Sequence, residues 1–367
     1  MVYSSRMQSR KLPVVVGIMV AAFFAALVAS YIAYQRAYSY VANDLPAVIN
    51  PVAPPPRLPQ PTAAPAKPGE RPQESIVLPQ PWNGKERLNV LLLGIDQREG
   101  ETDKAYRTDT MIVLTIDPAT KEAGMLSIPR DTWVPIPGYQ NPNYRINDAN
   151  FLGDTFDYPG GGSALARKIV EQFLGVQIHY VVRLNFTAFE NFIDRLGGVA
   201  IDVPADIYDD TYPTNDYSTE VFSITKGLHQ LDGATALKYA RTRHTDNDFG
   251  RARRQQQVIF AVKERLKDPQ VLASLVAAAP ELVQQLSASV KTDMTLDEMQ
   301  QLAMLATQID KGKIKTEVLD LRYSQYATTP DGQFVNIPDR ARIAELRDTF
   351  FSSTPERTAT NATSDSP

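Results

Sequence analysis

The chain concentrates arginines in the segment Tyr239–Gln257, which reads YARTRHTDNDFGRARRQQQ. The whole chain of 367 residues has a formal net charge of −4, so this segment is a basic cluster in an acidic protein. Guanidinium groups bind phosphate and carboxylate groups through paired hydrogen bonds. The fold must therefore bring anionic partners to this segment. Its arginines are Arg241, Arg243, Arg251, Arg253 and Arg254.

The spacing of residues after Gly250 predicts a helix with one face turned to the core. Val258 and Val262 recur at helical spacing and mark that face. Arg251 and Gln255 lie on the same stripe. We therefore expect both of these polar side chains to point into the protein.

The other arginines of this helix are expected to lie differently from Arg251. Arg254 lies at the edge of the inward stripe, whereas Arg253 lies on the opposite face and is expected in solvent. An inward guanidinium requires a partner, because a buried unpaired charge is very costly. Two kinds of partner remain open: an anionic ligand, or the nearby carboxylates of Asp246 and Asp248.

Residues 12–34 form an uncharged, mostly apolar run of about the 20 residues that a helix needs to cross a bilayer. Arg6, Arg10 and Lys11 precede the run, so the positive-inside rule places residues 1–11 in the cytoplasm and the rest of the chain outside. The length of the run and the lack of a small-residue cleavage motif favour an anchor over a cleaved signal peptide. The sequence thus predicts a single-pass protein of the cell membrane.

Proline, alanine and short polar residues dominate the segment Pro46–Pro81. Such segments favour extended polyproline II structure and cannot bury a core. We interpret residues 35–84 as a semi-rigid stalk that holds the folded part away from the membrane. The polar residues 351–367 are expected to form a disordered tail.

The folded part is expected over residues 85–350, with a core at 88–266 and a C-terminal extension. Short apolar runs rich in β-branched residues predict strands, and helical spacing with glycine or capping signals predicts helices. Strands that alternate with helices indicate a layered α/β fold. The expected strands are 89–96, 110–117, 123–128, 178–185, 199–203 and 315–321, and the expected helices are 163–174, 188–196, one from about 250, and 296–308 capped by Thr295 and Glu298.

Residue content and motifs exclude several kinds of chemistry. The absence of cysteine excludes disulfides and thiolate catalysis, and the three histidines are too far apart in sequence to suggest a zinc site. Ser127 has no G-x-S-x-G context, and no phosphate-binding G-x-x-x-x-G-K-[ST] loop occurs. The acidic net charge and the expected location outside the membrane argue against nucleic-acid binding.

Two carboxylates flank the first two expected strands. Asp96 ends the first strand and Asp109 begins the second, with Arg98 and Arg107 beside them. Ligand sites of α/β sheets collect at strand ends, and paired carboxylates without histidine suit Mg²⁺ that shares a substrate phosphate. The alternative is that these aspartates cap turns and pair with the neighbouring arginines.

Two further arginines follow strand or loop signals. Arg130 comes directly after Pro129 in SIPRD, and proline lacks the amide hydrogen that would continue a strand ladder. Arg145 lies in the loop sequence YRIND. Each of them is either a site residue or an ordinary loop residue.

Taken in chain order, the motifs GIDQR, RTDTM, SIPRD, RIND, LDGATALKYARTRH and DFGRARRQQQV resemble the LytR–CpsA–Psr proteins, a family of bacterial cell-wall enzymes with one N-terminal membrane helix. The resemblance covers roughly residues 88–266. It implies a three-layer α/β/α domain with a central mixed sheet. It also implies transfer of a glycopolymer from a polyprenyl pyrophosphate carrier onto peptidoglycan or a related cell-wall acceptor.

Carried over residue by residue, the resemblance assigns roles to the motif side chains. Asp96 and Asp109 are expected to hold Mg²⁺ and orient the pyrophosphate, and which carboxylate acts as a base stays open. Asp96, Asp109, Arg130 and Arg251 are the expected catalytic residues. Arg145 stands where many members have lysine. The expected pyrophosphate-binding residues are Arg98, Arg107, Arg130, Arg145, Arg241, Arg243, Arg251 and Gln255.

The residues and the resemblance agree on mechanism. Arginines together with Mg²⁺ would stabilise the charge that develops as a pyrophosphate bond breaks. The prenyl chain requires an apolar tunnel, for which the expected lining residues are Phe186, Phe189, Phe192, Ile193 and Leu196, although such a stripe also suits an ordinary core. The alternative function is a non-catalytic protein that binds or senses lipid-linked glycans.

Overall fold

The computed structural model describes residues 80, 82–97, 101, 105–214, 218–243, 247–286 and 289–352. The expected cytoplasmic segment 1–11, the membrane helix 12–34 and nearly all of the stalk 35–84 and tail 351–367 lie outside these residues. Among the helices that are described, none combines the length and the apolar character needed to cross a bilayer.

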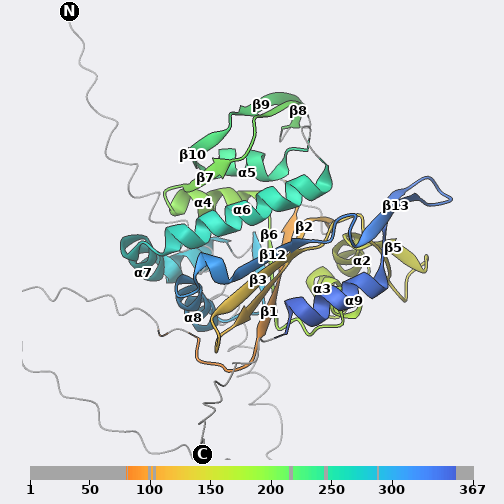
Figure 1. Ribbon diagram of the computed structural model, residues 1–367, viewed down its shortest axis with the longest axis horizontal. Coiled ribbons are helices and arrows are strands. Elements are labelled where there is room, and N and C mark those ends of the chain that lie inside the picture. Colours follow the sequence, from red (N-terminus) through yellow and green to blue (C-terminus); the bar gives the residue numbers. More distant parts are fainter. Residues whose placement is uncertain are drawn as a thin grey trace, which may run out of the picture.

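A six-stranded mixed sheet forms the centre of the fold (Figure 1). The first three strands along the chain pair in antiparallel fashion, while β6 and β12 run parallel to β1 and β3. The expected mixed sheet is therefore confirmed. In spatial order its strands are β11 (Val290–Thr292), β6 (Tyr180–Leu184), β1 (Leu88–Ile95), β2 (Thr108–Asp117), β3 (Glu122–Ser127) and β12 (Ile314–Val318).

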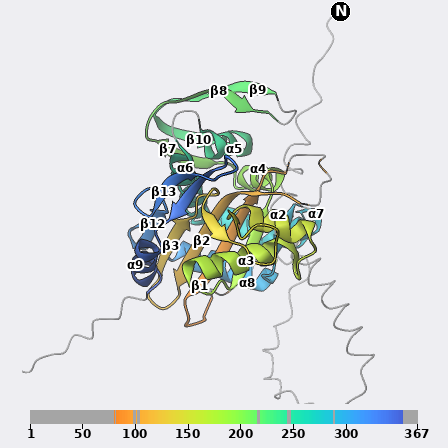
Figure 2. The ribbon, with the colours of Figure 1, turned by 90° about the vertical axis from the view of Figure 1, so that its right-hand side faces the viewer.

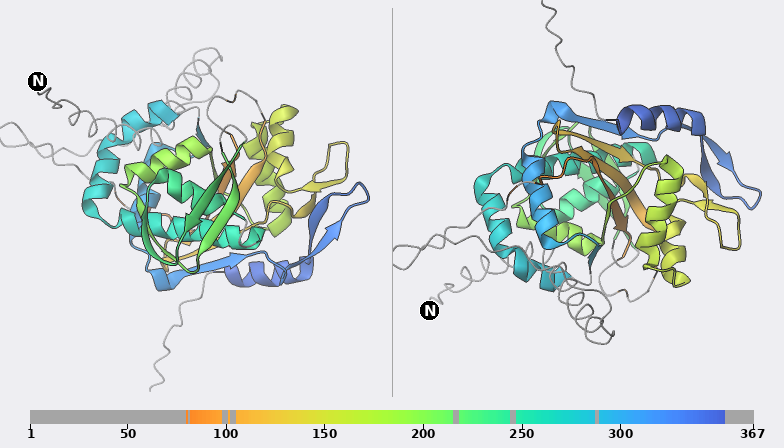
Figure 3. Two further views of the ribbon diagram at one scale, coloured as in Figure 1. Left: turned by 90° about the horizontal axis from the view of Figure 1, so that it is seen from above. Right: turned by 90° about the horizontal axis from the view of Figure 1, so that it is seen from below.

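Both faces of the sheet are buried under helices, which makes three layers (Figure 1 and Figure 3). Side chains alternate between the faces of a strand, so Leu91 and Leu93 join one core and Val90 joins the other. One face carries α2 (Asp148–Thr155), α3 (Gly161–Leu174) and α9 (Arg340–Phe350). The other carries α4 (Phe186–Arg195), α5 (Gly233–Arg241), α6 (Asp248–Leu266), α7 (Pro269–Leu286) and α8 (Leu296–Thr307).

Four two-stranded ribbons lie outside the central sheet. The expected strand at 199–203 is real, but it pairs with β10 in one of these ribbons and does not join the main sheet. Only its alternate residues are buried, as suits a strand with one solvated face. Figure 2 shows the β8–β9 ribbon at the top of the molecule. The ribbons are β4 (Trp133–Pro135) with β5 (Asn143–Arg145), β7 (Val199–Val203) with β10 (Gly227–Leu231), β8 (Ile207–Pro213) with β9 (Thr219–Ile224), and β13 (Ser324–Thr328) with β14 (Phe334–Pro338).

Local signals in the sequence explain where the helices begin. The side chain of Asn247 accepts hydrogen bonds from the backbone amides of Phe249 and Gly250, so α6 starts slightly before the expected residue 250. The expected capping box of α8 is present, with Thr295 and Glu298 each bonded to the backbone of the other.

Helix α6 is pinned to the sheet by a glutamine that the helical pattern did not single out. The Gln256 side-chain nitrogen lies 2.8 Å from Ser127 Oγ, 2.8 Å from the Glu317 carbonyl oxygen and 3.3 Å from the Met125 carbonyl oxygen. Gln256 is only 5% exposed. It therefore joins α6 to β3 and β12, which sets the height of α6 over the edge of the sheet.

Removal of this amide should destabilise the fold. We expect Gln256→Ala to lower the free energy of unfolding by about 2–3 kcal/mol, because buried acceptors lose their donor and a small void remains. The control is Gln140→Ala, in the exposed loop between β4 and β5, which should stay within about 0.5 kcal/mol of wild type. Urea unfolding followed by circular dichroism measures both, and equal stabilities would contradict the tethering role.

Candidate functional site

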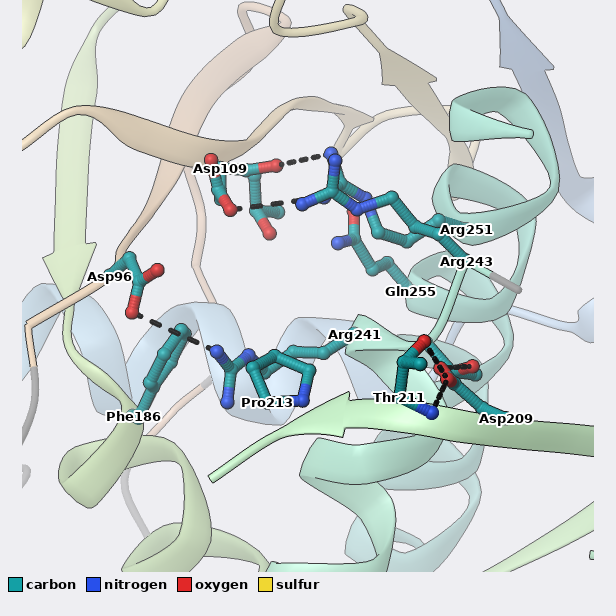
Figure 4. Close-up of a pocket in the computed structure, with 12 residues that line it drawn as sticks. Asp96, Asp109, Phe186, Asp209, Thr211, Pro213, Arg241, Arg243, Arg251 and Gln255 are labelled. Atoms are coloured by element: carbon teal, nitrogen blue, oxygen red, sulfur yellow. Dashed lines mark hydrogen bonds and ion pairs between the residues drawn. The ribbon is translucent and has the colours of Figure 1, made fainter. Parts of the chain in front are cut away.

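A charged cavity of about 240 Å³ lies where β1 ends and β2 begins (Figure 4). The two strands form an antiparallel pair, and a register shift after Gly94 aligns Ile95 with Thr108. The carboxylates that follow these positions therefore reach the same edge of the sheet. The charged and amide side chains that line the cavity are Asp96, Asp109, Asp209, Arg241, Arg243, Arg251 and Gln255.

Arg251, in the first turn of α6, is a deeply buried charge of the cavity. Its side chain is 4% exposed and lies 2.7 Å from Asp248 Oδ1 and 3.8 Å from Asp109 Oδ2, and it donates a hydrogen bond to the Asp109 carbonyl oxygen. Burial lowers the pKa of this arginine, while Asp248 and Asp109 oppose that change. The internal salt bridge to Asp248 is thus present, and Arg251 also lines the cavity; Asp246 lies outside the described residues.

Arg130 holds Asp109 from the other side. Its guanidinium donates to Asp109 Oδ1 at 2.7 Å, and its Nε lies 4.0 Å from Asp248 Oδ1. Burial raises the pKa of the Asp109 carboxyl, but Arg130 and Arg251 outweigh burial and hold that pKa below its ordinary value. Asp109 is therefore a carboxylate at neutral pH. Its basicity is correspondingly low.

Arg241, at the end of α5, reaches the cavity across an aromatic ring. Its guanidinium carbon lies 4.0 Å from the centre of the Phe186 ring, and the guanidinium donates to the hydroxyl of Tyr212 at 3.1 Å. The same group lies 3.8 Å from Asp96 Oδ1. These contacts stretch the side chain toward the carboxylate, as Figure 4 shows.

The β8–β9 ribbon closes one side of the cavity through residues that the motifs did not indicate. Asp209 is 4% exposed and accepts a 2.6 Å hydrogen bond from the Thr242 hydroxyl, which follows α5. Thr211 and Pro213 of the same strand also line the cavity. The sequence offered one indication of this contact. In a strand with alternating burial, one residue of the pair Asp209–Asp210 must face inward, and a buried aspartate requires a partner.

An apolar cavity of about 90 Å³ adjoins the charged one. The two share Thr110, Phe186, Arg241 and Gln255 as lining residues. Gly94 lines the apolar cavity beside this junction, and a Cβ atom there would lie 3.0 Å from Cβ of Thr110, one of the shared residues. The walls of the apolar cavity include Leu92, Ile112, Leu184, Phe189, Val258 and Ile259.

A second apolar cavity, of about 250 Å³, lies further along the same face of the sheet. Val90, Leu114 and Val182 line it from the strands. Each lies two residues from a residue of the first apolar cavity on the same strand (Leu92, Ile112 and Leu184), so all six side chains point to the same face of the sheet. Phe192 of α4 also lines it. The space between the sheet and its helical cover thus extends away from the charged cavity.

Comparison with known proteins agrees with this arrangement. The chain matches the LytR_cpsA_psr family over residues 61–351. The chain belongs to the LytR–CpsA–Psr family. The expected family is confirmed, and the match reaches beyond residue 266 into the C-terminal extension.

Individual relatives of the family carry named activities. The chain is 36% identical over 217 residues to the Bacillus subtilis (strain 168) protein named polyisoprenyl-teichoic acid–peptidoglycan teichoic acid transferase TagT. The matched region is 59% of this chain and 62% of that relative. Among solved structures, Bacillus subtilis TagV superposes with a TM-score of 0.58 at 28% identity, covering 74% of this chain and all of that chain. The structure of TagT bound to LIIa-WTA has a TM-score of 0.55 at 27% identity, covering 72% of this chain and 90% of that one.

The structure brings together most of the site residues expected from the LytR–CpsA–Psr motifs. Six of them line the charged cavity, and Arg130 contacts it through Asp109. Their roles in binding and catalysis stay predictions. Arg98 lies outside the described residues.

Two expected pyrophosphate-binding residues lie elsewhere. The Arg107 side chain is 61% exposed, pairs with Asp148 at 2.5 Å and does not line the cavity. Arg145 pairs with Asp131 at 3.4 Å and donates to the Phe334 carbonyl oxygen. Both arginines thus pair with neighbouring carboxylates and neither lines the charged cavity, and their expected role in phosphate binding stays a prediction.

The expected tunnel residues also divide into two groups. Phe186 and Phe189 line the first apolar cavity and Phe192 lines the second. Ile193 and Leu196 are fully buried in the core and line neither of these cavities. The difference follows from the orientation of α4, whose remaining apolar positions pack against the β7–β10 ribbon and α5.

Two arginines of α6 provide a matched test of the site. Arg251→Ala should lower transfer roughly 10²-fold, about 3 kcal/mol, if the guanidinium stabilises charge that develops during reaction. Arg253 is 55% exposed and pairs with Asp320 at 2.8 Å, so Arg253→Ala should change stability by about 0–1 kcal/mol and leave turnover nearly unchanged.

Turnover and melting temperature are measured for both variants. Loss of stability in Arg251→Ala with full turnover per folded molecule would make Arg251 a scaffold residue.

Proposed function

We propose that this chain is a phosphotransferase that moves a glycopolymer from a polyprenyl pyrophosphate carrier onto peptidoglycan or a related cell-wall acceptor. The observation that carries the proposal is the junction of an arginine-lined cavity with an apolar one. That combination fits a ligand with a doubly charged phosphate head and a long hydrocarbon chain. The named activities of TagT and the structure of TagT with LIIa-WTA support the same substrate class.

The reaction requires little covalent chemistry from the protein. The acceptor hydroxyl oxygen forms a bond to the phosphorus that carries the glycan, while the bridging bond of the pyrophosphate breaks. The electron pair of the broken bond stays on the polyprenyl phosphate, and the hydroxyl proton leaves to a base. Arg241, Arg243 and Arg251 line the cavity, and their fixed positive charge would stabilise the leaving phosphate.

Asp96 and Asp109 of the charged cavity fit Mg²⁺, as their oxygen donors are the kind that this ion prefers. Within the described residues, no three histidine, cysteine or acidic side chains converge as a complete protein cage for a metal requires. Asp96 and Asp109 would therefore hold the ion together with substrate oxygens. Bound there, Mg²⁺ would neutralise charge on the phosphates. The depressed pKa of Asp109 suits it to hold a cation, and it makes Asp109 the weaker choice for a base.

Coupled product is the direct test of this function. The purified full-length protein in detergent is incubated with Mg²⁺, a polyprenyl-pyrophosphate glycan and peptidoglycan oligomers, and glycan-linked peptidoglycan is quantified. Asp109→Asn should reduce product at least about 10²-fold and weaken the Mg²⁺ dependence, because the charge that pairs with the cation is lost.

Asp117→Asn is the control, at the opposite end of β2. Asp117 is buried and pairs with Arg87 at 3.2 Å, so its change should affect stability more than turnover per folded molecule. Equal losses of turnover from both variants would remove the metal assignment. Binding of the donor by wild type with no product at all would favour the non-catalytic, glycan-sensing alternative.

We also propose that residues 12–34 anchor the protein in the cell membrane, with residues 1–11 cytoplasmic and the domain outside. The uncharged run and the basic residues before it support this orientation. An anchored domain is tethered to the membrane that carries a polyprenyl substrate, and the apolar cavities are suited to that substrate.

Protease treatment of intact spheroplasts tests the orientation. External protease should cut within residues 46–81 and release a soluble fragment that contains the domain, because an extended proline-rich segment offers an accessible backbone. A full-length protein that resists cleavage until the cells are lysed would show that the domain faces the cytoplasm.

A further inference from the structure

Three aromatic rings form a stack beside the first turn of α6. Tyr326 of β13 stacks on Phe249 with ring centres 6.1 Å apart and an angle of 22°, and Phe334 of β14 lies 4.9 Å from Tyr326. Phe249 is buried, whereas Tyr326 is 44% and Phe334 51% exposed. We call these three residues the aromatic platform. Two large rings held open to solvent on a short ribbon require an explanation beyond core packing.

The platform is fixed to the loop that carries Arg130. The backbone amide of Asn336 donates to the Asp131 carbonyl oxygen at 2.9 Å, and Thr132 and Asn336 form a β-bridge. Arg145 adds a hydrogen bond of 3.0 Å to the Phe334 carbonyl oxygen while it pairs with Asp131. Arg145 therefore positions the platform relative to the residue that follows Arg130.

Helix α6 passes the platform and both cavities in sequence. Phe249 belongs to the platform, Arg251 and Gln255 line the charged cavity, and Val258 lines the apolar one. At 1.5 Å per residue, Phe249 and Val258 are about 14 Å apart along the axis. The platform and the apolar cavity thus lie on opposite sides of the arginines, with β13 near the N-terminal end of α6 and α7 at its C-terminal end (Figure 1).

This order matters for a phosphoryl transfer, in which the attacking and leaving oxygens lie roughly in line. The polyprenyl phosphate leaves on the side of the apolar cavity, so the acceptor hydroxyl approaches from the opposite side. We propose that the aromatic platform binds the glycan chain of the peptidoglycan acceptor. The proposal rests on the function proposed above and assigns the acceptor its place.

The chemistry of the platform suits a carbohydrate. Sugar rings present apolar C–H faces that pack on aromatic rings, and their hydroxyl and acetamido groups require hydrogen-bonding partners around the edge. Thr328 is exposed on β13, two residues beyond Tyr326 along the strand. It lies directly opposite Phe334 in the ribbon, on the same face as the rings. A hydrogen-bonding group therefore borders the exposed aromatic surface.

Equilibrium binding tests the proposal without any need for turnover. The full-length protein in detergent is titrated with β-1,4-linked N-acetylhexosamine oligomers prepared from peptidoglycan, and binding is measured by calorimetry. Tyr326→Ala should weaken binding about five- to tenfold, and Tyr326→Trp should retain it, because stacking needs a flat ring. Phe156→Ala is the matched control, since Phe156 is 64% exposed and packs on Tyr139 away from α6; it should bind as wild type does.

A transfer assay then separates the roles of the rings. Tyr326→Ala should raise the half-saturating concentration of acceptor by the same factor, while the affinity for a polyprenyl-pyrophosphate glycan stays at the wild-type value. Loss of donor affinity with unchanged acceptor binding would overturn the proposal and place the donor glycan on the platform. Oligomer binding that is equal in wild type and Tyr326→Ala, or absent from wild type, would also overturn it.

The two proposals fail in different ways. Tyr326-dependent binding of oligomers without any coupled product would refute the transferase and support the platform. Coupled product with an acceptor dependence that ignores Tyr326 would support the transferase and refute the platform.

Discussion

The site depends on the ion pairs that the buried guanidinium of Arg251 forms with Asp109 and Asp248. A charge that is 4% exposed is tolerable only if carboxylates surround it, and Asp109 and Asp248 supply them from β2 and from the start of α6. Asp109 in turn is shared with Arg130, which follows β3. One ionic network therefore fixes the first turn of α6 against two strands. Gln256, one turn further along, fixes the same helix to β3 and β12.

The two faces of the sheet serve different purposes. The face under α2, α3 and α9 forms a continuous core that includes Leu91, Leu93 and Val113. The face under α4 to α8 also contains a core, but cavities remain between the strands and the helices. Such voids reduce stability relative to full packing, and proteins retain them where a ligand will fill them.

The sequence predicted those parts that depend on local spacing. The stripe of Arg251 and Gln255 followed from helical periodicity, and the convergence of Asp96 and Asp109 followed from two adjacent strands. Features that depend on pairing across long distances were missed. Residues 199–203 were correctly predicted as a strand, but the sequence did not indicate its pairing with β10 outside the main sheet, and β4 and β5 are too short for a periodic signal. The ion pairs of Arg107 with Asp148 and of Arg145 with Asp131 were also not predicted, because the sequence does not show whether an arginine beside carboxylates contacts a ligand or a neighbouring side chain.

The junction beside Gly94 would separate the two tasks that the proposed lipid carrier imposes on its enzyme. The arginines would recognise the head of the carrier by charge, whereas passage of the chain would depend on the width of the opening. Gly94 and Thr110 limit the width of the apolar cavity beside the junction, because a side chain in place of the glycine would press on the threonine. The width of this opening and the recognition of charge can therefore change independently. Single substitutions at Gly94 or Thr110 could adapt the opening to a wider or narrower hydrocarbon chain without a change in the ionic network of Arg251 and Asp109.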